Sequence, residues 1–182
     1  MCSSLGLVAR RLVLVAWCHS MVVSMVVSPP TKPTTVAPAF TLHEEAAAGN
    51  TGAVELLLAA GLSVDARNEF GSTPLHLAVV KGQTDVANVL IDSGATINAA
   101  NEDGNTPLHA AVGTGNIECA KLLLARGAEP DVTSNAGNKP LRVAAQKGDA
   151  AMLSALVEGG ATMDEDTAHD AFWCATRPQS RE

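Results

Sequence analysis

A period of 33 residues constrains this chain more than any other feature. Four consecutive segments, 35–67, 68–100, 101–133 and 134–166, align under one another without a gap. The short helices of such a unit are not stable alone, and each unit buries its apolar face only against its neighbours. The sequence therefore predicts an all-α solenoid of four helix-turn-helix units.

The second unit indicates where its helices begin and end. Thr73 is a good N-cap and Pro74 a good first helical residue, because the first turn has no use for the missing N–H. Gly82 can adopt the left-handed conformation that ends this helix. A second helix follows over about 84–93, with apolar residues at i, i+3 and i+4 that give it one apolar face. The same columns are apolar in the other units.

A more specific pattern lies at the start of two units, Thr73-Pro74-Leu75-His76 and Thr106-Pro107-Leu108-His109. Glycines recur at 49, 82, 115 and 148, and Gly-Ala pairs at 94–95, 127–128 and 160–161. On these residues the chain closely resembles the ankyrin-repeat family over about three quarters of its length. The resemblance implies β-hairpin connections that project from the helices. It also implies a structural histidine, which bonds local backbone and fixes the turn.

Departures from the repeat indicate how the stack ends. Alanines 78, 111 and 144 share a column in which adjacent units approach closely, whereas the first unit has Glu45 there. An unpaired carboxylate in a tight interface is costly, so we expect unit one to be the N-terminal cap. The fourth unit has Lys139-Pro140-Leu141-Arg142 in place of the Thr cap and the His. We expect its first helix to be less firmly held.

The residues after the last unit, 167–182, are predicted to close the other end. Ala168, Ala171, Phe172 and Ala175 mark one helical face. This spacing predicts a C-terminal capping helix over 167–176. Phe172 and Trp173 would then cover the exposed end of the stack.

Residues 1–34 differ in composition from the repeats. Arg10 and Arg11 precede an apolar stretch over 12–27, a Pro/Thr-rich linker follows, and the first acidic residue of the chain is Glu44. This order is typical of an export signal. The stretch of sixteen residues, interrupted by His19, Ser20 and Ser24, is short for a membrane span of about 20 residues. We expect a targeting or anchoring segment that exports the protein or contacts a membrane through 12–27. An organelle transit peptide and a disordered tail on a cytoplasmic protein are the alternatives.

Charge and spacing exclude several classes of site. Residues 35–166 carry seven Lys/Arg against seventeen Asp/Glu, and nucleic-acid affinity needs basic side chains, so we expect no DNA or RNA binding. The four cysteines form no CxxC pair and predict neither a disulfide framework nor a zinc site. His43, His76 and His109 stand one repeat apart, about 10 Å, which is too far for shared metal ligands. We expect no cofactor and no metal.

Cysteine chemistry offers the one catalytic hypothesis. Cys119 falls in the apolar column of Met152 and is predicted to be a small core side chain. Cys174 and His169 stand five residues apart, but the sequence supplies neither an oxyanion donor nor an orienting acid beside them. We therefore predict a non-catalytic protein.

The family resemblance implies where such a protein binds. Ankyrin arrays bind through their hairpin tips and the exposed side of their first helices, so we predict a monomeric adaptor or scaffold for a protein partner. Phe70 is the most informative position, because an aromatic side chain at a tip has no core to enter and aromatic residues dominate interface hot spots. The alternative is that Phe70 folds back on Lys81 or its own loop. The predicted protein-binding residues are Arg67, Glu69, Phe70, Ser72, Val80, Lys81, Glu102, Asp103, Asn105, Thr114, Asn135, Asn138, Gln146 and Lys147.

Three further interpretations stay open beside the adaptor. The protein could be an inhibitory or protective partner of an enzyme in the same compartment. It could also be the targeting fragment of a larger ankyrin-bearing enzyme. Asn98 resembles the position that asparaginyl hydroxylases modify in some ankyrin repeats, although a turn asparagine that bonds its own backbone is the simpler interpretation.

Overall fold

Over the residues that the structure describes, the fold consists of eight helices in four consecutive pairs. The computed structural model describes residues 37–165, 167 and 168, with side chains from Leu42 onward. The pairs are α2 (Ala37–Ala48) with α3 (Thr51–Ala59), α4 (Pro74–Val80) with α5 (Thr84–Asp92), α6 (Pro107–Thr114) with α7 (Ile117–Ala125), and α8 (Pro140–Lys147) with α9 (Ala150–Glu158). Only two or three residues join the members of a pair, so the second helix must reverse direction.

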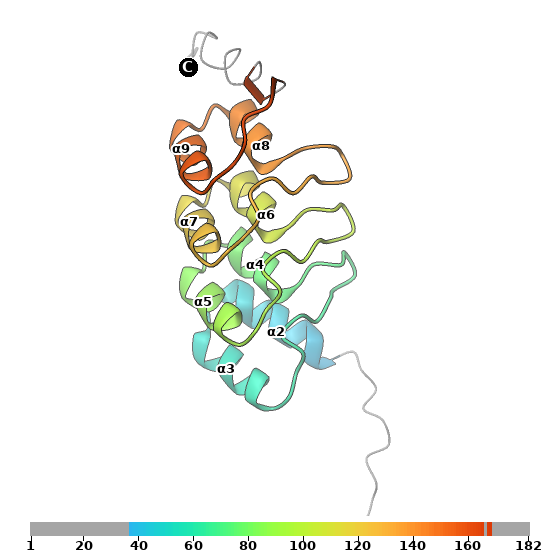
Figure 1. Cartoon of the computed structure of the whole chain (residues 1–182). Helices are drawn as coiled ribbons and strands as arrows, with labels where there is room; N and C mark the ends of the chain where they lie inside the picture. The colour runs from blue at the N-terminus through green and yellow to red at the C-terminus, as the bar shows by residue number, and fades with distance from the viewer. Residues whose placement is uncertain (1–36, 166, 169–182) are drawn as a thin grey trace, which may run out of the picture. The chain divides into compact units, whose positions relative to one another are not determined.

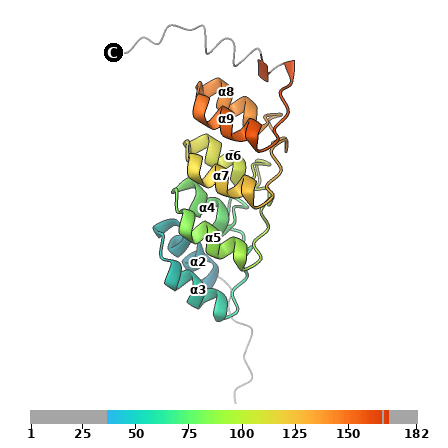
Figure 2. The ribbon, with the colours of Figure 1, turned by 60° about the vertical axis from the view of Figure 1, so that its left-hand side comes forward.

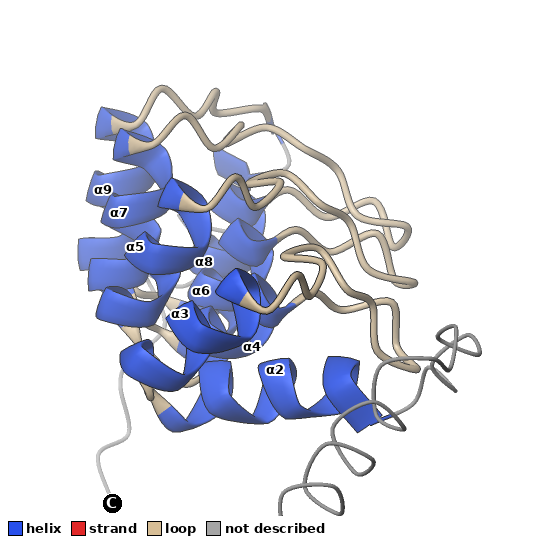
Figure 3. Cartoon of the chain, turned by 90° about the horizontal axis from the view of Figure 1, so that it is seen from below, coloured by secondary structure: helices blue, strands red, loops and turns tan. Residues whose placement is uncertain are grey.

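The pairs stack in register, in two layers of helices. The first helices, α2, α4, α6 and α8, form one layer, and the second helices, α3, α5, α7 and α9, form the other (Figure 1, Figure 2). Each helix packs against its counterpart in the next unit, α2 on α4 and α3 on α5, and so on along the stack. The loops between units project from the side of the first helices (Figure 3). The predicted all-α repeat solenoid is confirmed.

The first helices start as the Thr-Pro pattern predicts. Thr73 and Thr106 are extended N-caps, each followed by Pro and closed by a capping box with the histidine three residues later. Gly115 ends α6 and Gly148 ends α8 in the left-handed conformation. These stops leave helices of only seven or eight residues in units two to four, which depend on packing for stability.

The core runs between the two layers along the whole stack. The alanine column of residues 78, 111 and 144 is fully buried, since no larger side chain fits where α4, α6 and α8 approach one another. Leucines fill the space between the layers, and the second helices contribute Leu90 and Leu123, both 0% exposed. In units two to four the structure buries or half-buries the helical faces predicted from the apolar columns. In unit one the prediction is wrong, because Leu56 of this column is 73% exposed and the buried residue of α3 is Val54.

Unit one differs from the others on its outer side. Glu45 is half-buried rather than buried, and its Oε2 accepts a hydrogen bond from Asn50 Nδ2 at 2.6 Å. Helix α2 has twelve residues and begins at Ala37, one repeat before Phe70, so a helix replaces the loop of the later units. Both features fit an N-terminal cap.

Unit four lacks the capping box. Lys139 stands at the N-cap of α8 without a side-chain capping bond, and its Nζ lies 3.2 Å from Asp164 Oδ2. Glu165, Thr167 and Ala168 are helical, and Asp164 Oδ1 accepts the Thr167 N–H at 2.8 Å. The rest of the predicted capping helix, with Phe172 and Trp173, lies outside the described residues, as does the predicted targeting segment 1–34.

The connections between units contain turns, and no strand is assigned in the part of the chain that the structure describes. Each loop is closed at its base by a backbone bond, Asn68 N to Ser72 O and Asn101 N to Asn105 O, both at 3.0 Å. A turn bond lies inside each loop, Gly71 N to Asn68 O at 2.9 Å and Gly104 N to Asn101 O at 3.0 Å. Side-chain bonds replace further ladder bonds at the tips. The β-hairpin geometry expected of these loops is therefore not confirmed.

Side chains also link the connections that follow the second helices. Asp65 Oδ1 accepts the Thr96 N–H at 3.0 Å. Two units later, Asp131 makes the same bond with Thr162. Asn98 Oδ1 accepts the Glu129 N–H at 3.0 Å. This bond to the next unit corrects the expectation that Asn98 bonds its own turn. The carboxyl or amide group is shared between units because the stack brings residues 31 positions apart together.

Candidate protein-binding surface

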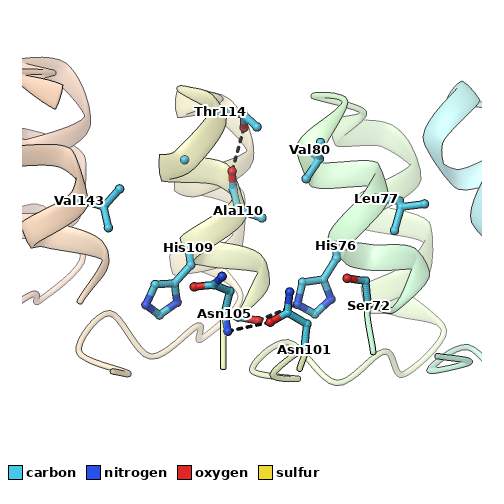
Figure 4. A pocket seen from close by; sticks show the side chains of 11 residues that line it. Ser72, His76, Leu77, Val80, Asn101, Asn105, His109, Ala110, Thr114 and Val143 are labelled. Carbon is cyan, nitrogen blue, oxygen red and sulfur yellow. Dashed lines mark hydrogen bonds between the residues drawn. The ribbon is translucent and has the colours of Figure 1, made fainter. Parts of the chain in front are cut away.

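A groove of about 370 Å³ opens along the first helices, beside the projecting loops. Leu77, Ala110 and Val143, which occupy the same position of α4, α6 and α8, form its apolar floor (Figure 4). Val80 and Thr114 lie at the helix ends on one side, and the loops with the histidines lie on the other. The groove is thus built from three successive units.

The histidines hold the loop side of the groove in place. His76 Nε2 donates to the backbone oxygen of Asn105 at 3.0 Å, so a side chain of unit two holds the loop of unit three. His109 repeats this bond with Asn138 O at 3.0 Å, and His43 does so with Ser72 O at 2.9 Å. Each loop is therefore fixed on the first helix of the preceding unit.

Both ring nitrogens of His76 and His109 are engaged. His76 Nδ1 lies 3.2 Å from the Thr73 N–H that it accepts and 2.9 Å from Thr73 Oγ1, and His109 makes the equivalent bonds with Thr106. Burial lowers the pKa of both rings, and the carbonyl bond from Nε2 opposes this shift. The neutral imidazole is the form that fits these partners. Within the described ranges, no group of three or more His, Cys, Asp or Glu residues could hold a metal ion.

The loop tips are connected to one another. Asn68 Oδ1 accepts the N–H groups of Phe70 at 3.0 Å and Ser72 at 2.9 Å, and Asn101 does the same in the next loop. Between loops, Glu102 N donates to Phe70 O at 3.2 Å. A Cβ added to Gly71, whose φ is +69°, would lie 3.0 Å from Glu102 N, so this close approach needs glycine. The tips thus form one continuous and ordered edge.

Cys119, which the sequence predicts to be a small core side chain, is buried in the structure. It is 1% exposed, and burial raises the pKa of its thiol, with a smaller contribution from the Glu118 carboxylate. A buried, protonated thiol is a poor nucleophile. Cys174 and His169 lie outside the described residues.

The comparison with protein families identifies this architecture. A family model described as ankyrin repeats (3 copies) matches residues 42–134 and, in a second match, residues 100–167. The chain belongs to the ankyrin-repeat family. A comparison with curated proteins finds no match. Ankyrin repeats are in general protein–protein interaction modules, and their fold is a non-catalytic interaction fold. No helix of the described residues is long and apolar enough to cross a membrane.

Most of the residues predicted to bind a partner lie on the accessible side of this ankyrin array. The exposed ones are Arg67, Glu69, Phe70, Val80, Lys81, Glu102, Asp103, Thr114, Asn135, Gln146 and Lys147. Ser72, Asn105 and Asn138 are half-buried, and their carbonyl groups accept the histidine bonds. The groove itself brings together Ser72, Val80, Asn105 and Thr114 of the predicted set.

The prediction missed the floor of the ankyrin groove. Leu77, Ala110 and Val143 were not among the predicted residues, although they share one column of the repeat. A usable signal was present, because Leu77 stands three residues before Val80 and so shares its face of α4. Gly113 was not predicted either, because a glycine has no side chain with which to contact a partner.

Proposed function

We propose that this protein is a non-catalytic adaptor that binds a partner protein through the groove and the loop tips beside it. The observation that supports this proposal most is Phe70, whose side chain is 63% exposed at a loop tip. Its backbone is held by Asn68 on one side and by Glu102 on the other. A large apolar side chain presented to water on an ordered loop is typical of an interface anchor.

Capture of partners with tagged full-length protein, followed by surface plasmon resonance with the purified partner, tests this function. Phe70→Ala should weaken binding by about thirtyfold or more, because one buried aromatic anchor contributes ~2 kcal/mol or more. Leu56→Ala is a matched control, since Leu56 is 73% exposed but lies on α3, away from the groove. Removal of the Leu56 side chain should leave the affinity for the partner unchanged.

Two outcomes would contradict a binding surface centred on Phe70. If Phe70→Ala binds normally while changes at Gln146 and Lys147 abolish binding, recognition lies on unit four. If Leu56→Ala and Phe70→Ala weaken binding equally, the effect is a general loss of exposed apolar area. An enzyme as the captured partner, with turnover that falls on binding, would favour the inhibitory alternative over an adaptor.

A further inference from the structure

Gly113 stands inside α6 at a place where the backbone does not need a glycine. Its φ lies outside the left-handed region, and a Cβ built on it would meet no atom within 4 Å. Glycine inside a helix is less stable than alanine, so the fold gains nothing from it here. The missing side chain of Gly113 leaves an open space in the groove, which is called the gap below. The same column holds Val80 in unit two and Gln146 in unit four.

The surroundings of this gap favour an aliphatic side chain. The groove around it is lined by Leu77, Ala110 and Val143, all half-buried, and by Val80, which is 41% exposed. An aliphatic group placed over Gly113 would remove apolar surface of both partners from water. A polar group would lose hydration without gaining an equal set of hydrogen bonds.

The loop rim of the groove is acidic. Glu69, Glu102 and Asp103 are exposed at neighbouring tips, and none of them forms an ion pair with another residue that the structure describes. The guanidinium group of Arg67 donates to two backbone carbonyls, at 3.0 and 2.7 Å. The excess of carboxylates on this rim favours a cationic group of the partner.

The opposite rim, at the helix ends, is basic. Lys81 is exposed directly after the last residue of α4, and Lys147 is exposed at the end of α8. The ammonium group of Lys147 donates to the backbone oxygen of Gly113, so it lies at the edge of the gap. These two ammonium groups favour an anionic group of the partner on this side.

We propose that the groove recognises a partner segment in which one aliphatic side chain stands between a basic and an acidic residue. This deepens the proposed function and rests on it. The aliphatic side chain fills the gap over Gly113. The basic residue faces Glu102 and Asp103, and the acidic residue faces Lys81 and Lys147. The eight residues of α6 span about 12 Å, which an extended chain covers in about four residues. Glu102 and Asp103 lie on a loop that projects from the start of α6, so the two charges stand at least about four positions apart.

Selection of random short peptides displayed on phage against the full-length protein tests this proposal. The enriched peptides should share an aliphatic residue between a basic and an acidic one. The best of them, synthesised with a fluorophore, should bind Gly113→Leu at least about tenfold more weakly by fluorescence polarisation, a loss of about 1.4 kcal/mol. The new side chain enters open space, so thermal unfolding followed by circular dichroism should show no loss of stability.

Gly52→Leu is the matched control. Gly52 is also helical and exposed, and a Cβ there would also meet no atom within 4 Å, but it lies on α3 outside the groove. This variant should bind the peptide as the wild type does. Glu102→Lys should weaken binding, and replacing the basic residue of the peptide by Glu should restore it.

The outcomes separate this proposal from the proposed function. The proposed peptide site in the groove would be overturned if the selected peptides bind Gly113→Leu as tightly as the wild type. It would also be overturned if the selected peptides lack an aliphatic residue between a basic and an acidic one. Peptides lost in Phe70→Ala but retained in Gly113→Leu would reject the groove and leave the binding function standing. Failure to enrich any peptide would also reject the groove as a peptide site, and would leave the adaptor function to the capture experiment.

Discussion

A single histidine in each of units two and three links the start of a helix to the next loop. His76 needs an unprotonated Nδ1 to accept from Thr73 and a protonated Nε2 to donate to Asn105. Only one neutral tautomer satisfies both partners. The bonds between units therefore depend on a neutral imidazole, which becomes charged when the pH is lowered.

Stability should fall on mild acidification. The folded-state pKa values of His76 and His109 lie below 6.5, so between about pH 6.5 and those lowered values the unfolded chain binds protons that the native state excludes. The free energy of unfolding is thus unaffected by these rings above about pH 6.5 and decreases below it. Urea unfolding at about pH 7.5 and about pH 5.5 measures this difference.

The matched variant carries His76→Gln and His109→Gln. It should be less stable at the higher pH and should show a smaller fall between the two values, because glutamine does not titrate. An equal fall in both proteins would assign the pH dependence to other groups. Asp164, whose pKa is lowered to about 2, does not contribute to this difference between the two pH values, because its stabilising charge is present at both and is lost only as pH falls from about 3.8 toward 2.

At this scale the sequence predicts what stands in a column but not what bonds across units. The Thr-Pro starts, the buried leucines and the alanine column all follow from the 33-residue period and helix periodicity. The histidine bonds join residues 29 positions apart, and the Asn98 bond joins residues 31 apart. Residues 29 or 31 positions apart stand in different columns of the 33-residue repeat, so aligning the units does not reveal that they are bonded. They depend on how far each unit is rotated and shifted on the next, which only the stacked structure reveals.

At the scale of the helix, the second helices owe their stability to packing. Helices α5 and α7 have nine residues each, too few for a stable helix in isolation. Leu90 and Leu123 are fully buried between their own layer and the first helices. Removing either one should therefore weaken the contact that makes the helix form.

Leu90→Ala or Leu123→Ala should lower the free energy of unfolding by about 2–5 kcal/mol, as truncations of buried leucine do. Lys121→Ala on α7 is the control. Its side chain is 56% exposed and pairs with Glu118 only at 3.8 Å, so the change should stay within about 0.5 kcal/mol. Urea unfolding gives both numbers. An equal decrease in the free energy of unfolding for Leu123→Ala and Lys121→Ala would mean that α7 packs a different face against the core.

At the scale of the whole array, the two ends of the stack are not equivalent. Leu124 is half-buried because unit four covers it: a Cβ on Gly159 would lie 2.7 Å from Leu124 Cδ1. Val157 occupies the same column of unit four and is 48% exposed, since no further unit follows it among the described residues. Met163 is 58% exposed, whereas its counterpart Ile97 is half-buried. Unit four thus presents an apolar end that needs a cover.

The segment that follows is the cover we expect. Asp164 caps a helical stretch at Thr167, and in the sequence Phe172 and Trp173 follow four and five residues after Ala168, outside the described residues. Phe172→Ala with Trp173→Ala should lower the free energy of unfolding by about 2 kcal/mol, since a fully buried aromatic side chain contributes about 1.5–3 kcal/mol. It should also promote end-to-end association, because the apolar end is then open.

Urea unfolding and analytical ultracentrifugation of full-length protein measure these two effects. The control is a chain shortened after Thr176, which keeps both aromatic residues and should match the wild type. If the aromatic side chains lie on this end, Val157→Ala should cost less in the doubly substituted background than in the wild type, because the contact it would lose is already gone. Equal costs in the two backgrounds, together with an unchanged monomer, would mean that the aromatic pair packs elsewhere. The exposed Val157 and Met163 would then belong to a surface for another protein, at the opposite end of the array from unit one.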